Sequence, residues 1–150
     1  MGRYSYKGAL HKLITYAKDN GVKKIDINYN DFSYIKFDDI GKPNKIMIES
    51  GKSYEIKVYL LLHELGHCKL RANWDIFTEN LPYLADVEYY NDKKMKKTIN
   101  YLVSCVEEEF KAWDFGYQLG NELGIRINKD KWNNLKYECL MSYINYYSNV

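Results

Sequence analysis

The sequence has only three cysteines and no internal repeats, and these two features argue against a disulfide-rich or a repeat protein. Its three cysteines, Cys68, Cys105 and Cys139, lack paired spacing, so we expect reduced thiols and no disulfide framework. No internal repeat, low-complexity tract or linker interrupts the 150 residues. With 46% hydrophobic residues, a chain of this length predicts one domain, residues 1–150, around one core.

The chain also lacks a charge bias and a long apolar segment. Lysine and arginine total 22 against 20 acidic residues, which gives no reason to expect a nucleic-acid or a membrane partner. Residues 1–7 contain no apolar stretch of the kind found in secretory signals, and no later segment is long and apolar enough to span a bilayer. We therefore expect a cytoplasmic protein.

Histidine is scarce as well, and two of the three histidines belong to the motif His63-Glu64-Leu65-Gly66-His67. Residues four apart on a helix lie one above the other, so His63 and His67 can bind one metal ion from the same face. Glu64 is rotated by about 100° from His63, which suits it to hold a metal-bound water and accept its proton. This arrangement is typical of zinc metalloproteases.

The surroundings of the motif favour a metal site over a pair of surface histidines. The motif follows the apolar run Val58-Tyr59-Leu60-Leu61-Leu62, so we expect this helix to be buried on most sides. Buried imidazoles and carboxylates need polar partners, and a zinc ion is a common one. The third histidine, His11, lies beside an apolar strip on the first helix and is expected at the surface.

Two periodicities predict an α+β fold. Apolar residues recur at helical spacing in four segments, and polar and apolar residues alternate in three short segments between the first two helices. Ser53 and Thr98 are placed to cap two of the helices. We expect a small, mainly antiparallel sheet packed on the histidine-containing helix, with further helices towards the C-terminus. The expected helices span residues 7–20, 53–71, 98–124 and 129 onward, and the strands span residues 24–29, 34–38 and 45–49.

Two histidines do not complete a catalytic zinc site, which usually has three protein ligands and an open position. In one known metalloprotease pattern the third ligand is a histidine downstream of the motif. That pattern would require glycine at position 70 and histidine at position 73, but this chain has Leu70 and Asn73. A carboxylate or a cysteine is therefore expected as the third ligand. The run Glu107-Glu108-Glu109, on the helix with the longest apolar strip, is the candidate stretch.

Helical spacing ranks these three glutamates. Glu109 is three residues after Val106 and four before Trp113, so it projects from the apolar face, where a buried carboxylate needs a partner. Glu107, four residues after Val103 of the apolar strip and three before Phe110, borders the other side of the strip and is the alternative ligand. Glu108 is expected to point away.

Three glycines and one cysteine carry further expectations. Gly66 costs about 1 kcal/mol inside a helix relative to alanine, which indicates that something packs closely there. Gly116 and Gly120 continue the face of Glu109 and would let another helix approach closely. Cys105 lies one turn before Glu109, and we expect it to be a buried free thiol; a role as a metal ligand is the alternative.

The motif at residues 63–67, followed by Glu109-Phe110-Lys111-Ala112, resembles the small ImmA/IrrE-like metallopeptidases of bacteria, phages and mobile elements, a branch of the gluzincins. The resemblance implies a zincin-like minimal metallopeptidase domain. It implies that His63 and His67 bind Zn²⁺ and that Glu64 is the general base. The family's downstream Glu-x-x-Ala element supplies the third ligand, and it matches Glu109.

These features together predict a zinc metalloendopeptidase of phage or mobile-element type. It would hydrolyse peptide bonds in a specific intracellular protein, in the host cytoplasm if phage-encoded, by means of a zinc-bound water that Glu64 activates. In metalloproteases of this general type an edge strand above the zinc helix can bind an extended peptide by strand addition. The rival hypothesis is a non-catalytic metal-binding or regulatory interaction protein that keeps the zincin fold.

Overall fold

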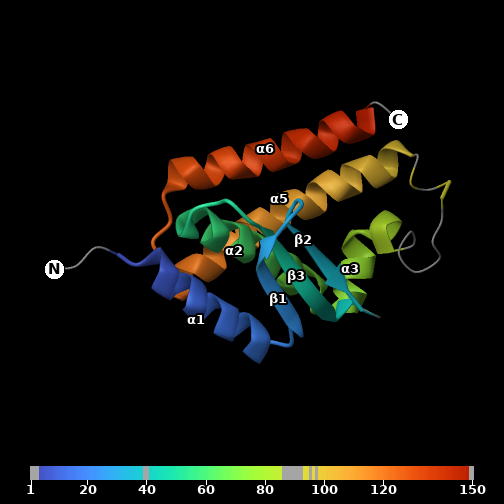
Figure 1. Cartoon of the computed structure of the whole chain (residues 1–150). Coiled ribbons are helices and arrows are strands. Elements are labelled where there is room, and N and C mark those ends of the chain that lie inside the picture. The colour runs from blue at the N-terminus through green and yellow to red at the C-terminus, as the bar shows by residue number, and fades with distance from the viewer. Residues whose placement is uncertain (1–3, 39–40, 86–92, 95, 97, 149–150) are drawn as a thin grey trace.

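The chain forms a small sheet with helices before and after it (Figure 1). The computed structural model describes residues 4–38, 41–85, 93–94, 96 and 98–148. The elements are α1 (Tyr6–Asp19), β1 (Lys24–Tyr29), β2 (Tyr34–Phe37), β3 (Pro43–Glu49), α2 (Tyr54–Arg71), α3 (Trp74–Asn80), α5 (Ile99–Glu122) and α6 (Lys129–Ser148). The expected α+β class is confirmed, and each expected helix and strand is present within a few residues of its predicted bounds.

The helix starts follow the local capping signals in the sequence. The hydroxyl of Ser53 accepts a hydrogen bond from the backbone N–H of Ile56 at 3.2 Å, so Ser53 caps α2 as expected. Thr98 caps α5 in the same way, because its hydroxyl accepts from the N–H of Tyr101 at 3.2 Å. These caps place the first turn of the histidine-containing helix and of the glutamate-containing helix.

The sheet is mixed, which corrects the expectation that it would be mainly antiparallel. Its strand order is β1-β3-β2, with β1 parallel and β2 antiparallel to β3. The central strand carries three consecutive buried apolar residues, Ile46, Met47 and Ile48, whereas both outer strands are only half-buried. The most apolar strand therefore takes the position that is paired on both sides, although β1 and β2 follow each other in the chain.

Helices α1 and α2 pack with β3 in one main core cluster. Leu10 and Leu13 of α1, with 2% and 1% of their surface exposed, lie in this cluster with Ile46 of β3. Every residue of α2 from Lys57 to His67 is buried, which confirms that this helix is enclosed on most sides. The buried members of the cluster on α2 are Val58, Tyr59, Leu60, Leu61, Leu62 and Leu65.

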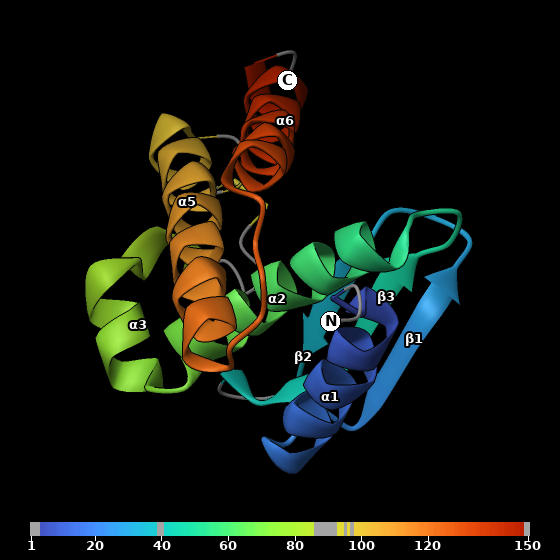
Figure 2. The same ribbon diagram turned by 90° about the vertical axis from the view of Figure 1, so that its left-hand side faces the viewer.

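Helices α5 and α6 lie side by side and antiparallel, and α2 lies between this pair and the part formed by α1 and the sheet (Figure 2). Trp132 connects α6 to the main core cluster. Its ring meets the rings of Tyr59 and Trp113 edge-on, with ring centroids 5.7 and 5.0 Å apart. α3 packs in a smaller apolar cluster with α5. No helix in the described part of the chain combines the length and apolarity needed to cross a membrane.

The backbones of α2 and α5 approach very closely where they cross. A Cβ atom built on Gly66 would overlap the carbonyl oxygen of Ala112, and one built on Gly116 would lie 2.6 Å from the carbonyl oxygen of Leu62. Gly120 is also tightly packed, against the side chains of Ile127 and Leu62. The expectation that these glycines permit close packing is confirmed. This crossing decides which side chains of α5 reach the motif on α2.

Candidate metal centre

Helix α2 presents three polar side chains at a spacing of four residues. His63, His67 and Arg71 are each 5–6% exposed, although imidazole and guanidinium groups are costly to bury without partners. The Nε2 atoms of His63 and His67 lie 3.2 Å apart, so both imidazoles point to one place. His11, in contrast, is exposed on α1, as the sequence predicts.

Helix α5 brings the carboxylate of Glu109 to the same place. Glu109 Oε2 lies 2.7 Å from His63 Nε2, and Glu109 Oε1 lies 3.2 Å from His67 Nε2. Glu109 is 6% exposed, so the three groups meet in the interior. The structure thus brings together the two histidines and the glutamate that the sequence ranked first.

The two imidazole nitrogens and the two carboxylate oxygens of Glu109, one oxygen beside each histidine, have spacings close to those of a tetrahedral zinc site. Imidazole nitrogen and carboxylate oxygen atoms bind zinc at about 2.0–2.1 Å, which places neighbouring ligands of a tetrahedron about 3.3 Å apart. The two distances that involve His67 are both 3.2 Å, close to this value. The distance from His63 to Glu109 is shorter because these two groups share a hydrogen bond. Two imidazoles and a carboxylate are also the ligand types that zinc accepts.

Glu108 corrects a prediction, because it points inward and not away. Its Oε1 atom lies 2.9 Å from Nδ1 of His67, and Glu108 is only 5% exposed. Arg71 holds the same carboxylate in place by donating from Nη2 to both oxygens, at 2.8 and 2.9 Å. The guanidinium of Arg71 lies near the rings of Phe37 and Phe77, 4.6 and 4.8 Å from their centroids. Glu108 therefore holds the Nδ1 atom of His67, which leaves the Nε2 atom pointing to His63 and Glu109.

Glu107, the alternative ligand, lies on the surface. Its carboxylate forms an ion pair with Lys111 at 3.1 Å, and the side chain of Glu107 is 45% exposed. Its distance from the histidines follows from the crossing of the helices. Ala112 of α5 is nearest to α2, and residues three and four before it, Glu109 and Glu108, share its face. Val103, which the spacing in the sequence placed on the buried strip, is 58% exposed.

Glu64 lies beside the donor atoms and is also buried. Its Oε1 atom is 3.4 Å from Nδ1 of His63, and it is 4% exposed. Within the described ranges of the chain, its carboxylate forms no ion pair with a lysine or arginine. A carboxylate of this kind keeps the capacity to accept a proton from a water molecule in the site.

Trp113 fixes the ring of His63. The two rings are stacked, with centroids 4.1 Å apart and planes inclined by 8°. Trp113 is 1% exposed, so it cannot move without disturbing the core. Both histidines of the motif therefore have a neighbour on α5 that sets their orientation.

The charged groups of the site shift each other's pKa values. Burial lowers the pKa of His67, but Glu109 and Glu108 outweigh this effect and raise it well above its ordinary value. Burial raises the pKa of Glu109, yet the neighbouring His67 holds it well below its usual range. Burial likewise raises the pKa of Glu108, while His67 and Arg71 lower it further than burial raises it. The imidazoles and carboxylates thus stabilise each other's charged forms, and a divalent cation among them would supply the same positive charge.

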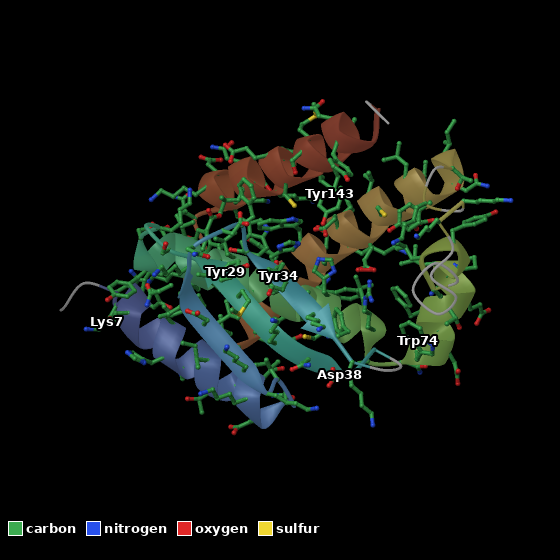
Figure 3. All side chains as sticks on the ribbon, turned by 45° about the vertical axis from the view of Figure 1, so that its right-hand side comes forward. Lys7, Tyr29, Tyr34, Asp38, Trp74 and Tyr143 are labelled. Atoms are coloured by element: carbon green, nitrogen blue, oxygen red, sulfur yellow. The ribbon has the colours of Figure 1, made fainter. Side chains whose placement is uncertain are left out.

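Helix α6 contributes two side chains to the surroundings of the site, Cys139 and Tyr143. The thiol of Cys139 donates to Glu109 Oε2 at 3.5 Å, and Cys139 lies within ligand distance of both His63 and Glu109. Tyr143 is on the side of α6 that faces α5 (Figure 3), and burial together with the negative charge of Glu109 raises its pKa. These two residues are one helical turn apart. That spacing was visible in the sequence, but no local signal indicated that α6 reaches the histidines.

The other two cysteines do not take part in the site. Cys105 is buried and forms no disulfide, and it lies in the smaller apolar cluster with Phe77 and Leu81 of the neighbouring segment, as expected. Cys68 is half-buried against the main core cluster. The alternative that Cys105 joins the histidines is not supported by its surroundings.

The donor atoms lie in the wall of a large cleft of about 1870 Å³. One side is formed by β2, since all four of its residues line the cleft. The other side includes Cys139, Ser142 and Tyr143 of α6. Tyr34 on β2 and Tyr143 mark these two walls (Figure 3). The cleft gives a molecule in solvent a path to the buried cluster.

Comparison with known proteins adds no relative to this description. No family model, no curated protein and no solved structure matches the chain. The site must therefore be interpreted from its own geometry and chemistry.

Proposed function

We propose that the protein is a zinc-dependent metallopeptidase with a zincin-like domain, in which His63, His67 and Glu109 hold the metal. The observation that carries the proposal is the meeting of three buried side chains, whose donor atoms make contacts of 2.7–3.2 Å, beside a large cleft. A purely structural role explains this cluster poorly, because buried charged groups seldom stabilise a fold more than apolar residues of similar volume would. A buried polar cluster beside an open cleft is instead typical of functional sites.

The roles of the residues follow from their positions. When bound, zinc lowers the pKa of a water molecule towards about 7 and polarises a carbonyl group. Glu64 accepts the proton of the attacking water and passes it to the nitrogen of the leaving amine. Glu108 and Trp113 keep the two imidazoles in their orientations.

An extended peptide is the substrate that the cleft suits best. Among the described residues β2 pairs with β3 alone, so it is an edge strand of the sheet, and it runs along the cleft. Its free edge offers backbone hydrogen-bond groups to an extended chain, which is a known mode of peptide recognition. The substrate would then lie between β2 and α6. The sequence expectation of an edge strand beside the histidine helix thus has a specific candidate in β2.

Metal content tests the ligand assignment. The protein is purified without added metal, and its zinc is counted by elemental mass spectrometry alongside Glu109→Ala and Glu107→Ala. We expect about one zinc per chain in the parent and in Glu107→Ala, and a large loss in Glu109→Ala. Glu107→Ala is a matched control, because it removes a carboxylate two residues away on the exposed face. Zinc retained at the parent level in Glu109→Ala would contradict the assignment.

Peptide hydrolysis tests the activity itself. The parent and Glu64→Gln are incubated with a mixed-sequence peptide library, and new termini are identified by mass spectrometry. Glu64→Gln is expected to keep zinc and lose hydrolysis by at least a factor of about 10². Equal cleavage by both proteins would show that Glu64 is not the general base.

A second function is favoured by one observation, the thiol of Cys139 beside Glu109. Four protein ligands and no open position are typical of a structural zinc site. In that case the chain would be a non-catalytic metal-binding or regulatory interaction protein that keeps the zincin fold. Zinc bound by both the parent and Cys139→Ser, without cleavage of any library peptide by either protein, would support this alternative.

A further inference from the structure

We propose that Cys139 is a fourth, displaceable metal ligand, so that α6 keeps the metal centre closed until the thiolate leaves. The inference rests on the proposed metal site and concerns its regulation. It assigns a role to a residue that is neither in the histidine motif nor on the helix of Glu109.

The position of the Cys139 sulfur carries the inference. Zinc binds thiolate sulfur at about 2.3 Å and carboxylate oxygen at about 2.0–2.2 Å, which separates the two atoms by about 3.5 Å in a tetrahedral site. Cys139 Sγ lies 3.5 Å from Glu109 Oε2. Cys139, His63 and Glu109 each offer a ligand atom within 4.8 Å of the other two. The sulfur therefore has the separation from the carboxylate that a shared ion requires.

The other two cysteines are a natural comparison. Cys105 and Cys68 pack against apolar side chains, where a thiol acts as a small apolar residue. Cys139 also packs against the main core cluster, but unlike the other two cysteines it lies beside the carboxylate of Glu109 and the imidazole of His63, which the fold has already brought together. A soft sulfur ligand beside imidazole and carboxylate groups is what a zinc ion would select.

Binding of Cys139 is a simple ligand exchange. The Sγ–H bond would break and its proton pass to solvent, and the sulfur would bind the metal as a metal-bound water leaves, with no change in oxidation state. While that bond exists, the position that a catalytic water would occupy is filled. Release needs only the reverse exchange with water, and the cleft beside Cys139 allows water to reach the metal. The resting protein would therefore be latent until water replaces the thiolate on the metal.

Cobalt substitution tests the inference directly. The metal is removed from the full chain, Co²⁺ is added, and the near-ultraviolet absorption is recorded for the parent, Cys139→Ser and Cys68→Ser. A thiolate bound to Co²⁺ gives a sulfur-to-metal charge-transfer band that nitrogen and oxygen ligands do not give. We expect this band in the parent and in Cys68→Ser and its loss in Cys139→Ser. Cys68→Ser is matched, because both cysteines are half-buried on helices beside the site.

The outcomes separate this inference from the proposed function. Co²⁺ bound without the band in the parent, or a band that persists in Cys139→Ser, would overturn the role of Cys139 and leave the metal site intact. Failure of the parent to bind Co²⁺, measured by elemental analysis, would overturn the proposed function as well.

A labelling experiment on the parent removes any dependence on the folding of a variant. The zinc-loaded and zinc-free proteins are alkylated with iodoacetamide, and modification of each cysteine is measured by peptide mass spectrometry. We expect zinc to protect Cys139 at least tenfold and to leave the rate at Cys68 unchanged. Equal modification of Cys139 in both states would overturn the inference.

Discussion

The two halves of helix α2 are both largely buried but are stabilised in different ways. The first half, residues 57–62, is buried mainly by apolar side chains of the main core cluster. The second half, residues 63–71, buries two histidines, Glu64 and Arg71, and these histidines and the arginine need carboxylates from α5 as partners. Burial itself stabilises the first half. In the second half burial is a cost that the ion pairs offset, so its residues are better explained by function than by stability.

The two halves also differ in what they require from the rest of the fold. The first half needs only apolar neighbours of about the right volume, which α1 and β3 supply. The second half needs particular atoms within hydrogen-bonding distance. Those atoms are in place because the backbones of α2 and α5 touch at Gly66 and Ala112. Substitutions in the two halves should therefore differ in both stability and metal binding.

Gly66→Ala should have the largest effect, because the added Cβ would overlap the carbonyl of Ala112 and force α2 and α5 apart. We expect a loss of about 5 kcal/mol in the free energy of unfolding, comparable with the whole stability of a small domain. Circular dichroism with urea unfolding measures the loss. Gly8→Ala is the matched control, since Gly8 is exposed in α1, and its stability should change by less than about 1 kcal/mol. Similar stability of both variants would show that the close crossing is not required.

Arg71→Ala should destabilise the second half by about 4 kcal/mol, because it leaves the buried carboxylate of Glu108 without the guanidinium that donates to both of its oxygens. Lys111→Ala is the control, since it removes a cation from an exposed ion pair with Glu107. Exposed pairs of this kind contribute at most about 0.5 kcal/mol. Urea unfolding of the metal-free proteins measures both changes. An equally small loss in Arg71→Ala would mean that the buried ion pair contributes no more than a surface pair.

Leu61→Ala should destabilise the first half by about 3 kcal/mol, through lost apolar burial and the cavity that remains. Its zinc affinity, measured by competition with a chelating dye, should stay within about twofold of the parent in the folded state, because sites without shared partners act independently. The second half keeps all its partners in this variant. A large drop in zinc affinity would show that the two halves are not independent.

Glu108→Gln should have a specific effect on the metal. Glutamine keeps the shape of the side chain but loses the charge that faces His67 and Arg71. Loss of such an orienting carboxylate lowers metal affinity about 10- to 100-fold. Glu107→Gln, one position away and exposed, should bind zinc as the parent does. Equal affinities in the two variants would show that Glu108 does not act through His67.

Much of the fold could be predicted because its signals are local. The alternating segments became strands, and Ser53 and Thr98 cap the helices that they precede. The close contacts at Gly66 and Gly116 were also predictable, since a glycine inside a helix is costly unless another backbone packs against it. Strand order was not predictable in this way. Whether β1 pairs with β2 or with β3 depends on which strand best fills the centre of the sheet against α1 and α2.

The sequence by itself determined that His63 and His67 point to one place, because residues four apart on a helix share a face. It also ranked Glu109 first, on the face of α5 that Gly116 and Gly120 continue, and α5 packs on α2 through that face. It did not determine that Glu108 faces the histidines too, and it placed Val103 on the buried strip although Val103 is 58% exposed. Only the tertiary structure decided this, because contact between two helix backbones depends on the shapes of both.

The same reason explains the part played by α6. Cys105 is close in sequence to Glu109 but lies in a separate apolar cluster, whereas Cys139 is 30 residues from Glu109 and touches it. Local periodicity places side chains on faces of a helix. The packing of the helices against one another decides which of those faces meet, and so which thiol stands beside the proposed metal site.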